Sequence, residues 1–325
     1  MIVLETTDSA RSDRTWMVAL AAALWGTSAL MREPLTGDLG LAPSTVVFGE
    51  HFVLVLCLLP WLPAALRAWW ASSTRTRVAI VVIGAGASAL ATTLFTAAFA
   101  TGFAIDGKPD VITPVALQKL QPLIAVLLAA VILAERIRPI FWLFVVPAMG
   151  GAWFLAFAEP FDVTLQSAEA GLLALGAATL WASGTVLGRL VGAELSATHI
   201  TALRFFFGLL TMIMVVGARG EPFTAPWEAV LYIVPLALIV GLLALSLYYR
   251  GLRYTPASRA TFAELAFPLT AAAVGLALGR NLVWNQWLGF GILLVAVTAL
   301  ALHESRSSRP AVAVPNRVED AVPAR

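Results

Sequence analysis

The sequence predicts an all-α polytopic membrane protein with ten transmembrane helices. Of its 325 residues, 60% are hydrophobic and only 12% are charged, and the mean hydropathy is +0.86. A soluble domain carries about 25% charged residues. Here the charges cluster in short gaps between apolar runs of about 20 residues, the length that crosses roughly 30 Å of hydrocarbon as a helix.

These apolar runs divide the chain into two units of five helices each. We expect a cytoplasmic tail at 1–15, a first unit at 16–158, a second unit at 169–303 and a disordered, polar cytoplasmic tail at 304–325. Arg11 and Arg14 before an apolar run also resemble the start of a signal peptide, but the same pattern precedes a first transmembrane helix. The expected spans are 16–33, 44–66, 78–103, 112–134, 139–158, 169–192, 197–218, 227–249, 256–279 and 283–303.

The basic residues predict the orientation of these spans. With a cytoplasmic N-terminus, only four basic residues lie outside: Arg32, Lys108, Arg219 and Arg280. Fourteen lie inside: Arg11, Arg14, Arg67, Arg75, Arg77, Arg136, Arg138, Arg189, Arg250, Arg253, Arg306, Arg309, Arg317 and Arg325. The positive-inside rule therefore places both termini in the cytoplasm and indicates an inner (plasma) membrane protein.

The two units share short segments at similar spacing. The matched segments are offset by 156, 149 and 146 residues: Trp25–Ser28 with Trp181–Gly184, Phe99–Gly102 with Tyr248–Gly251, and Leu120–Leu123 with Ala266–Leu269. Because five helices per unit is an odd number, the second unit must be inverted in the membrane. Inverted repeats are typical of secondary transporters, which bind substrate near the midplane between the repeats.

The chain also resembles the EamA-type permeases of the drug/metabolite transporter superfamily. The resemblance covers nearly the whole chain and depends on Trp25-Gly26, Leu120–Leu123 running to Ala134–Arg136, Leu203–Phe205, Tyr248–Leu252, Thr255–Ser258, Glu264–Leu269, Gln286 and Gly289. It implies ten helices, cytoplasmic termini and movement of small metabolites without ATP. The sequence departs from the family at Glu50-His51, where an arginine is typical, and at Arg280-Asn281, where a glutamate is usual.

Polar residues within the spans are the candidates for a substrate site, because an ionisable side chain in mid-membrane costs about 2.5–3.5 kcal/mol. We expect Lys119 to receive an anionic group of the substrate and Glu264 a cationic one, a lining that suits a zwitterion such as an amino acid. Packing between helices would equally account for the two tryptophans of the set, and an interfacial position for Tyr248. The predicted substrate-binding residues are Trp25, Gln118, Lys119, Gln121, Trp181, Tyr248 and Glu264.

Two prolines, Pro122 and Pro268, are predicted to interrupt helices 4 and 9 in mid-membrane, because proline removes a hydrogen bond of the helix ladder. Paired interruptions in corresponding helices point to a binding site. Glu50, His51 and Arg204 have two readings that the sequence leaves open. They serve proton coupling or gating, or Glu50 and Arg204 form structural pairs or snorkel to an interface.

Several classes of site are not expected. One cysteine gives no intramolecular disulfide, and three widely spaced histidines give no metal site. We expect no catalytic residue, no cofactor and no nucleic-acid partner. The prediction is therefore a secondary transporter, with export favoured, of a small polar or amphipathic metabolite. The alternatives are an intramembrane lipid-modifying enzyme and a channel or sensor, and a homodimer stays open.

Overall fold

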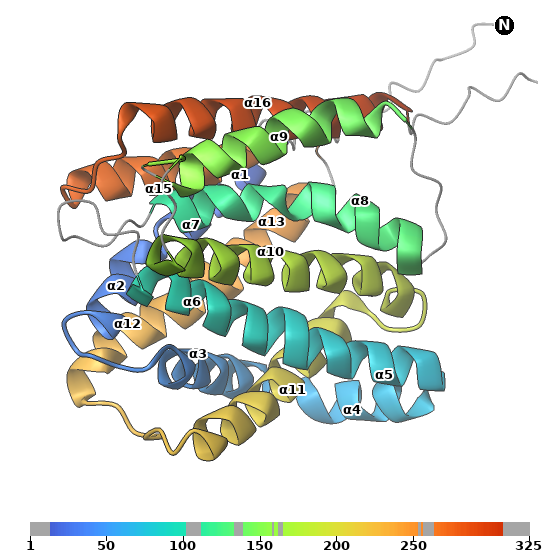
Figure 1. Ribbon diagram of the computed structural model, residues 1–325. Helices are drawn as coiled ribbons and strands as arrows, with labels where there is room; N and C mark the ends of the chain where they lie inside the picture. Colours follow the sequence, from blue (N-terminus) through green and yellow to red (C-terminus); the bar gives the residue numbers. More distant parts are fainter. Residues whose placement is uncertain are drawn as a thin grey trace, which may run out of the picture.

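The computed structural model describes residues 14–101, 112–132, 139–157, 159–161, 165–252, 255 and 263–307. Within these ranges every regular element is a helix, and the longer helices run side by side along one direction (Figure 1). Residues 1–13 and 308–325, which hold most of the predicted tails, lie outside the described residues, as do the basic residues Lys108, Arg136, Arg138, Arg253 and Arg259.

The first unit begins with two interrupted spans. The first span is divided into α1 (Thr15–Gly26) and α2 (Ala29–Thr36), and the second into α3 (Pro43–Leu58) and α4 (Leu62–Ala71). The third span consists of α5 (Thr74–Val82), the π-helical segment η1 (Ile83–Leu90) and α6 (Ala91–Thr101). The fourth consists of α7 (Ile112–Leu117), the 3₁₀ turn η2 (Gln118–Leu120) and α8 (Gln121–Ile132), and the fifth is α9 (Phe141–Ala156).

The second unit repeats much of this pattern. It contains α10 (Leu165–Val191), α11 (Ala197–Ala218), the 3₁₀ turn η3 (Trp227–Ala229), α12 (Val230–Pro235), the π-helical segment η4 (Leu236–Leu243), α13 (Ala244–Leu252), α15 (Ala266–Ala277) and α16 (Trp284–Ser307). The two π segments each have eight residues and begin 153 residues apart, at Ile83 and Leu236. An interruption of this kind is rare in helices and frequent at functional sites.

Among the described residues, four helices are long and apolar enough to cross a membrane: Thr74–Thr101, Ala168–Gly188, Ala197–Ala218 and Trp227–Tyr248. The pair α3 and α4 would make a fifth span, but it bends by 92°. The span predicted at 44–66 is therefore bent in the structure, between α3 and α4. Pro60 lies at the break and Pro63 is the second residue of α4, and each lacks the N–H that a continuous helix would use in its hydrogen-bond ladder. Shorter apolar helices lie within four further predicted spans: Ile112–Leu128, Phe141–Leu155, Ala266–Ala277 and Trp284–Leu300.

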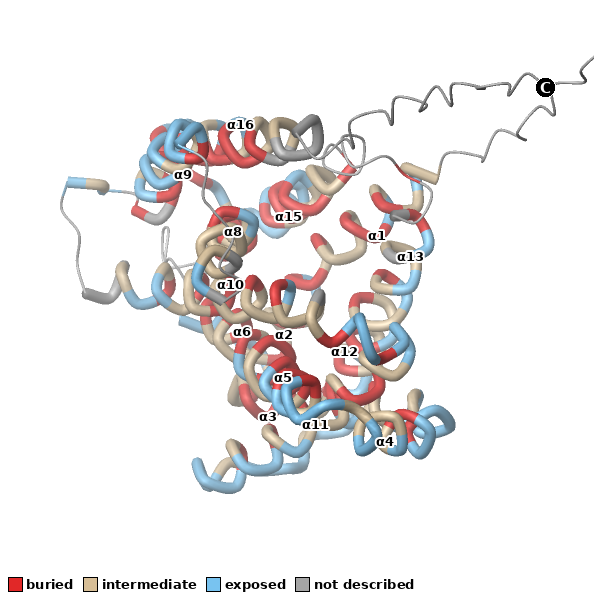
Figure 2. Tube along the Cα trace, turned by 90° about the vertical axis from the view of Figure 1, so that its right-hand side faces the viewer, coloured by how far each residue is buried: buried red, intermediate tan, exposed pale blue. Residues whose placement is uncertain are grey.

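The interior has several apolar cores rather than one. The largest joins residues of α1, α6, α7, α8, α9, α10, α15 and α16, and a second joins α4, α5, η1, α10 and α11. Buried residues gather where α2, α3, α5, α6 and α10 meet, whereas exposed ones lie along the outer faces of α4 and α9 (Figure 2). The largest core packs α1, η2 and α15 against one another.

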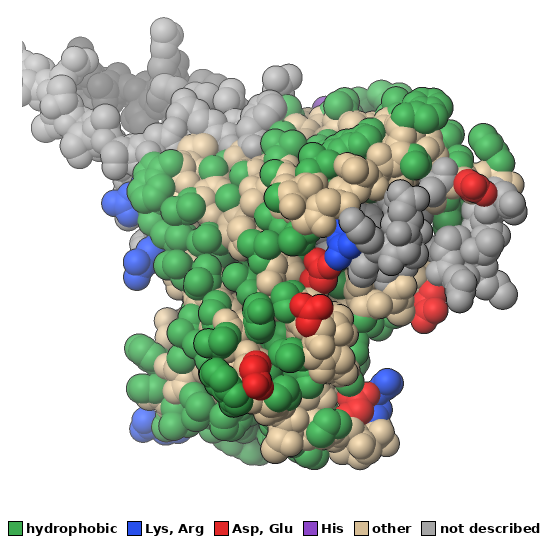
Figure 3. Space-filling model, turned by 90° about the vertical axis from the view of Figure 1, so that its left-hand side faces the viewer, with side chains coloured by type: hydrophobic (Ala, Val, Ile, Leu, Met, Phe, Trp, Pro, Cys, Tyr) green, Lys and Arg blue, Asp and Glu red, His purple; other side chains and the backbone are tan. Residues whose placement is uncertain are grey.

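The surface is largely apolar, as expected of a protein surrounded by lipid. Hydrophobic side chains dominate the face in Figure 3, and few charged ones interrupt them. Large exposed side chains include tryptophans near the ends of predicted spans, the pattern of interfacial aromatic belts: Trp16, Trp61, Trp70, Trp142, Trp227 and Trp284. The helices and this surface identify a multi-pass membrane protein.

Candidate functional site

The predicted substrate residues Trp25, Tyr248 and Glu264 lie together. Trp25 is near the end of α1 and Tyr248 is in α13, and their ring centroids are 5.1 Å apart. The Tyr248 hydroxyl donates a hydrogen bond of 2.6 Å to Oε1 of Glu264. A carboxylate within a span is thus held by a phenol, and an indole from the other half of the chain covers that phenol.

Lys119 joins this group from η2. Its Nζ lies 4.9 Å from the ring centroid of Phe267, the second residue of α15, in a cation–π contact. Lys119 also interacts electrostatically with Glu264. The structure therefore brings together the two opposite charges that the sequence assigned to one site. We call Trp25, Lys119, Tyr248, Glu264 and Phe267 the central cluster.

The remaining predicted substrate residues face other neighbours. Gln121 Nε2 donates to Thr185 Oγ1 on α10 at 3.3 Å. Trp181 packs its ring on Phe95 at 5.1 Å between centroids. Gln118 lies in the 3₁₀ turn, and its Oε1 is a buried atom without a hydrogen-bond partner among the described residues. Of these three, Gln118 retains an acceptor that a bound molecule can use.

The helix interruptions lie just before the two prolines rather than at them. Pro122 is the second residue of α8, which follows η2, and Pro268 is the third residue of α15, which follows a turn at Leu265. Both prolines therefore occupy a first helical turn, where the missing N–H has no helical partner to lose. The predicted interruptions exist, and each proline begins the helix after the break.

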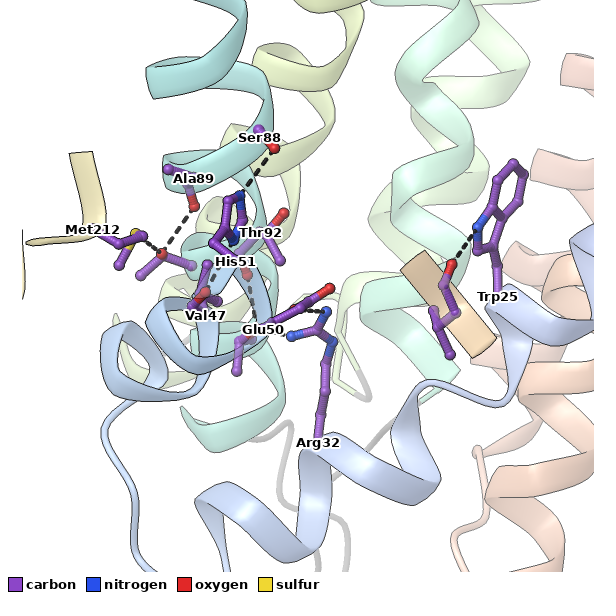
Figure 4. Close-up of polar contacts among 12 residues, drawn as sticks. Trp25, Arg32, Val47, Glu50, His51, Ser88, Ala89, Thr92 and Met212 are labelled. Carbon is purple, nitrogen blue, oxygen red and sulfur yellow. Dashed lines mark hydrogen bonds and ion pairs between the residues drawn. The ribbon is translucent and has the colours of Figure 1, made fainter. Parts of the chain in front are cut away.

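Glu50 belongs to a second buried group, on α2, α3 and α6. Arg32 Nη2 lies 2.9 Å from Glu50 Oε2, and the two side chains are 4% and 9% exposed. Arg32 Nη1 also donates to Thr96 Oγ1 at 2.6 Å (Figure 4). The assignment of Arg32 to an outer loop is therefore wrong. Its side chain turns inward because Glu50 and Thr96 satisfy it there.

His51 is fully enclosed next to Glu50. Its Nδ1 lies 2.9 Å from the Val47 carbonyl, and its Nε2 lies 3.0 Å from Ser88 Oγ (Figure 4). A carbonyl only accepts, so Nδ1 carries the proton, and in the neutral ring Nε2 accepts from the serine hydroxyl. The ring also meets Phe205 at 5.7 Å between centroids. These contacts fix the imidazole between α3, η1 and α11.

Arg204 approaches the same region from α11. Its Nη2 donates to the main-chain carbonyl of Ala87 at 3.3 Å, and Ala87 lies within η1. Its guanidinium also lies 5.8 Å from the Phe205 ring centroid. Arg204 therefore contacts the interrupted helix of the first unit rather than the central cluster.

Glu194, between α10 and α11, has a role that was missed in the sequence. Its carboxylate accepts hydrogen bonds from Ser73 N at 2.7 Å, Ser73 Oγ at 2.7 Å and Thr76 Oγ1 at 2.6 Å. The Ser73 backbone N–H, followed by the two hydroxyls, lowers the pKa of Glu194 to about 2. The carboxylate thus caps the start of α5 from the other half of the chain.

A similar contact was missed at the opposite end of α11. Glu221 accepts a hydrogen bond from Ser44 Oγ, and Thr45 Oγ1 donates to the Pro222 carbonyl at 3.0 Å. A carboxylate beside each end of α11 therefore ties this helix to the first unit. The only hint in the sequence is an acidic residue within each short connection.

Comparison with known proteins gives a family for this architecture. Residues 169–302 match the EamA-like transporter family. The Uncharacterized transporter YwfM of Bacillus subtilis is 26% identical over 294 residues, which cover 87% of this chain and 92% of that protein. The Riboflavin transporter ImpX of Fusobacterium nucleatum is 29% identical over 187 residues, or 55% of this chain and 62% of that protein.

A solved crystal structure shares the fold. It matches with a TM-score of 0.56 and 18% sequence identity, over 90% of this chain and 98% of its own length. The family match to residues 169–302 and the relatives, which are named as transporters and not enzymes, agree with the resemblance seen in the sequence. The second half of this chain therefore carries an EamA-like transporter domain, and the chain as a whole is similar to proteins named as transporters.

Proposed function

We propose that this chain is a secondary carrier of the inner membrane that moves a small polar or amphipathic metabolite, such as an amino acid, by alternating access. The observation that best supports this proposal is the central cluster. There Lys119 from the first half and Glu264 from the second interact within an otherwise apolar core.

The pairing of these charges suits a substrate that carries both signs. Each charge alone is costly in the membrane, so removing one partner from the pair would be unfavourable. A zwitterion avoids this, because its carboxylate replaces Glu264 at Lys119 while its ammonium group replaces Lys119 at Glu264. Trp25, Tyr248 and Phe267 then supply an apolar wall for the remainder of the molecule.

The position of the central cluster at two helix interruptions suits a carrier that works by alternating access. Lys119 is in the 3₁₀ turn between α7 and α8, and Glu264 directly precedes the turn before α15. Interrupted helices at corresponding positions support the proposed pair of inverted five-helix units, with the site between them. We assign Glu50, His51 and Arg204 to gating around η1 rather than to substrate binding, and we favour export as the direction.

A thermal-stability screen of the purified protein tests the proposed substrate class. A ligand that binds only the folded state stabilises it by about 2.7 kcal/mol at a hundred times its Kd. The library should contain amino acids and other zwitterions, and also flavins, because one relative is named as a riboflavin transporter. We expect a zwitterion to raise the melting temperature of the parent protein.

Two substitutions locate the ligand. We expect Lys119→Ala and Glu264→Ala each to abolish the ligand-induced shift, whereas Glu228→Gln, which changes an exposed glutamate in η3, should retain it. If an alanine variant does not fold, Lys119→Met or Glu264→Gln is used in its place, because each keeps the side-chain volume and removes the charge. An unchanged shift in folded variants at both positions would overturn the assignment of the site.

A further inference from the structure

The two π segments have a structural relation that the substrate site does not explain. Each interrupts the third helix of its unit, η1 at Ile83–Leu90 and η4 at Leu236–Leu243. Within a π turn the hydrogen-bond ladder shifts from i→i−4 to i→i−5, so the helix is a weak point for bending. Pro235 directly precedes η4, and Gly84 and Gly86 lie within η1.

A side chain from the opposite half bonds to the same position of each segment. Trp25 Nε1 donates to the carbonyl of Val240 at 3.1 Å (Figure 4). Arg204 Nη2 donates to the carbonyl of Ala87 at 3.3 Å. Ala87 and Val240 are each the fifth residue of their segment. The two carbonyls are thus equivalent, and each is held by the other half of the chain.

Each π segment also packs against a helix of the opposite unit. The segment η1 lies against α11, the second span of the second unit, and η4 lies against α3, which begins the second span of the first unit. The contact at η1 is tight, since a Cβ at Gly84 would come within 2.6 Å of Phe207 Cβ on α11. Each interrupted helix therefore packs against a helix of the other half.

Trp25 is the residue that touches both the site and a π segment. Its ring contacts Tyr248 at 5.1 Å, and Tyr248 holds Glu264. The same indole holds the Val240 carbonyl through its N–H. A substrate ammonium group at Glu264 competes with the Tyr248 hydroxyl for the same carboxylate, so a shift of Tyr248 reaches the indole packed on it and the hydrogen bond of that indole to η4.

We propose that η1 and η4 are the paired hinges of the carrier, and that Trp25 is the positioning residue that couples the substrate site to the hinge in η4. Arg204 restrains the hinge in η1 in the same manner. The coupling rests on the proposed substrate site at Lys119 and Glu264, whereas the restraint of each hinge by its donor does not.

Spin-label distances across each hinge test this without a substrate. In a Cys57→Ser background, which removes the single cysteine, Leu231→Cys and Ser246→Cys place labels at exposed positions on either side of η4. These positions are about 22 Å apart along a straight helix. A second pair, Val78→Cys and Ala100→Cys, flanks η1 at about 33 Å. Distances are measured in lipid nanodiscs.

Trp25→Phe removes the indole N–H and keeps an aromatic ring against Tyr248. We expect it to broaden or shift the distances across η4 and to leave those across η1 unchanged. Arg204→Met should show the reverse pattern. Trp153→Phe is the matched control, because it removes an indole bond to the Pro160 carbonyl outside both hinges, and it should change neither pair.

The outcomes separate the hinge from the carrier site. Unchanged distances across η4 in Trp25→Phe, or equal changes across both segments, would overturn the hinge proposal. If Trp25→Phe alters only η4 while Lys119→Ala and Glu264→Ala still bind ligand, the hinge stands and the proposed substrate site fails.

Discussion

Buried charges behave differently from exposed ones in this molecule. The Arg32–Glu50 pair is almost fully buried, whereas Arg219, which pairs with Glu221, is 64% exposed. Breaking a buried pair by removing one partner typically costs about 3–5 kcal/mol, because the remaining charge stays without a counter-ion. An exposed pair contributes roughly 0–1 kcal/mol, because water solvates each partner on its own.

Replacing Arg32 should therefore destabilise the protein strongly. We expect Arg32→Met to cost about 3–5 kcal/mol, seen as a large fall in the melting temperature of the purified protein. Arg219→Met should change it little. The double variant Arg32→Met with Glu50→Leu should recover part of the loss, since it leaves no unpaired charge. A single Arg32→Met variant as stable as Arg219→Met would contradict this account.

Glu194 predicts a dependence of stability on pH. The hydrogen bonds in the folded state lower its pKa to about 2, against about 4.3 for glutamate in an unfolded chain. A lowered pKa gives a contribution that is complete above about pH 4.3 and is lost as the pH falls toward 2. We expect Glu194→Gln to melt slightly below the parent protein at pH 7, and the difference to vanish near pH 2.

The matched control for this titration is Glu228→Gln, which changes another exposed glutamate. It should follow the parent protein at every pH. A Glu194→Gln variant whose melting temperature differs from that of the parent by the same amount at pH 7 and near pH 2 would show that the carboxylate is not the titrating group.

Some of these residues were predictable and others were not. Lys119 and Glu264 interrupt apolar runs. Because placing a charged side chain in the membrane costs free energy, the sequence alone indicated both as candidate site residues. Arg32 stands at the end of a predicted span, where a basic residue usually faces water, and only its partner Glu50 in three dimensions draws it inward. Glu194 and Glu221 lie in short connections, and their hydroxyl partners are more than a hundred residues away in the chain.

At the scale of elements, composition predicted where helices break better than how they break. Pro122 and Pro268 marked two of the interrupted helices. The π and 3₁₀ geometry was not predictable, because it depends on donors such as Trp25 that arrive from another helix. The bend between α3 and α4 was missed, although Pro60 and Pro63 signal it.

Glycines at helix crossings can be ranked by the space around them. A Cβ at Gly289 of α16 would lie 2.5 Å from both Gly151 O and Leu155 N of α9, whereas a Cβ at Gly291 meets nothing within 4 Å. Backbone atoms cannot move aside cheaply, so we expect Gly289→Ala to cost about 1–3 kcal/mol. Gly291→Ala, two residues away in the same helix, should leave the melting temperature unchanged or slightly raised.

This comparison tests the close approach of α9 and α16, because both variants add the same methyl group to one helix. Equal melting temperatures for Gly289→Ala and Gly291→Ala would show that the two helices do not pack through Gly151 and Gly289.

At the scale of the whole molecule, the unequal distribution of basic residues across the membrane and the similarity of the two halves agree with one arrangement of the spans. Moving Arg32 into the interior strengthens the asymmetry, because it removes a basic residue from the outer set. Each half then contributes to the other at the central cluster, at the π segments and at both ends of α11. The number of spans and the inversion of the halves remain predictions, because length and composition alone do not show them.

Labelling with a membrane-impermeant maleimide tests the orientation. Two single-cysteine variants are made in the Cys57→Ser background. Arg75→Cys lies at the start of α5 and Thr224→Cys in the segment after α11. Both positions are exposed, and they lie on opposite predicted sides of the membrane. We expect labelling of Thr224→Cys in intact cells and of Arg75→Cys only after permeabilisation. The reverse pattern would invert the topology, and labelling of both in intact cells would refute the predicted span arrangement.

The central claim is that the chain is a carrier whose substrate site contains Lys119 and Glu264. Counterflow in proteoliposomes tests it most directly, with the ligand that stabilises the purified protein loaded inside and a radiolabelled trace outside. The account predicts saturable, transient accumulation of label that falls at least tenfold in Lys119→Ala and Glu264→Ala at equal reconstitution. Non-saturable flux, or more than half of the parent activity in both variants, would contradict it.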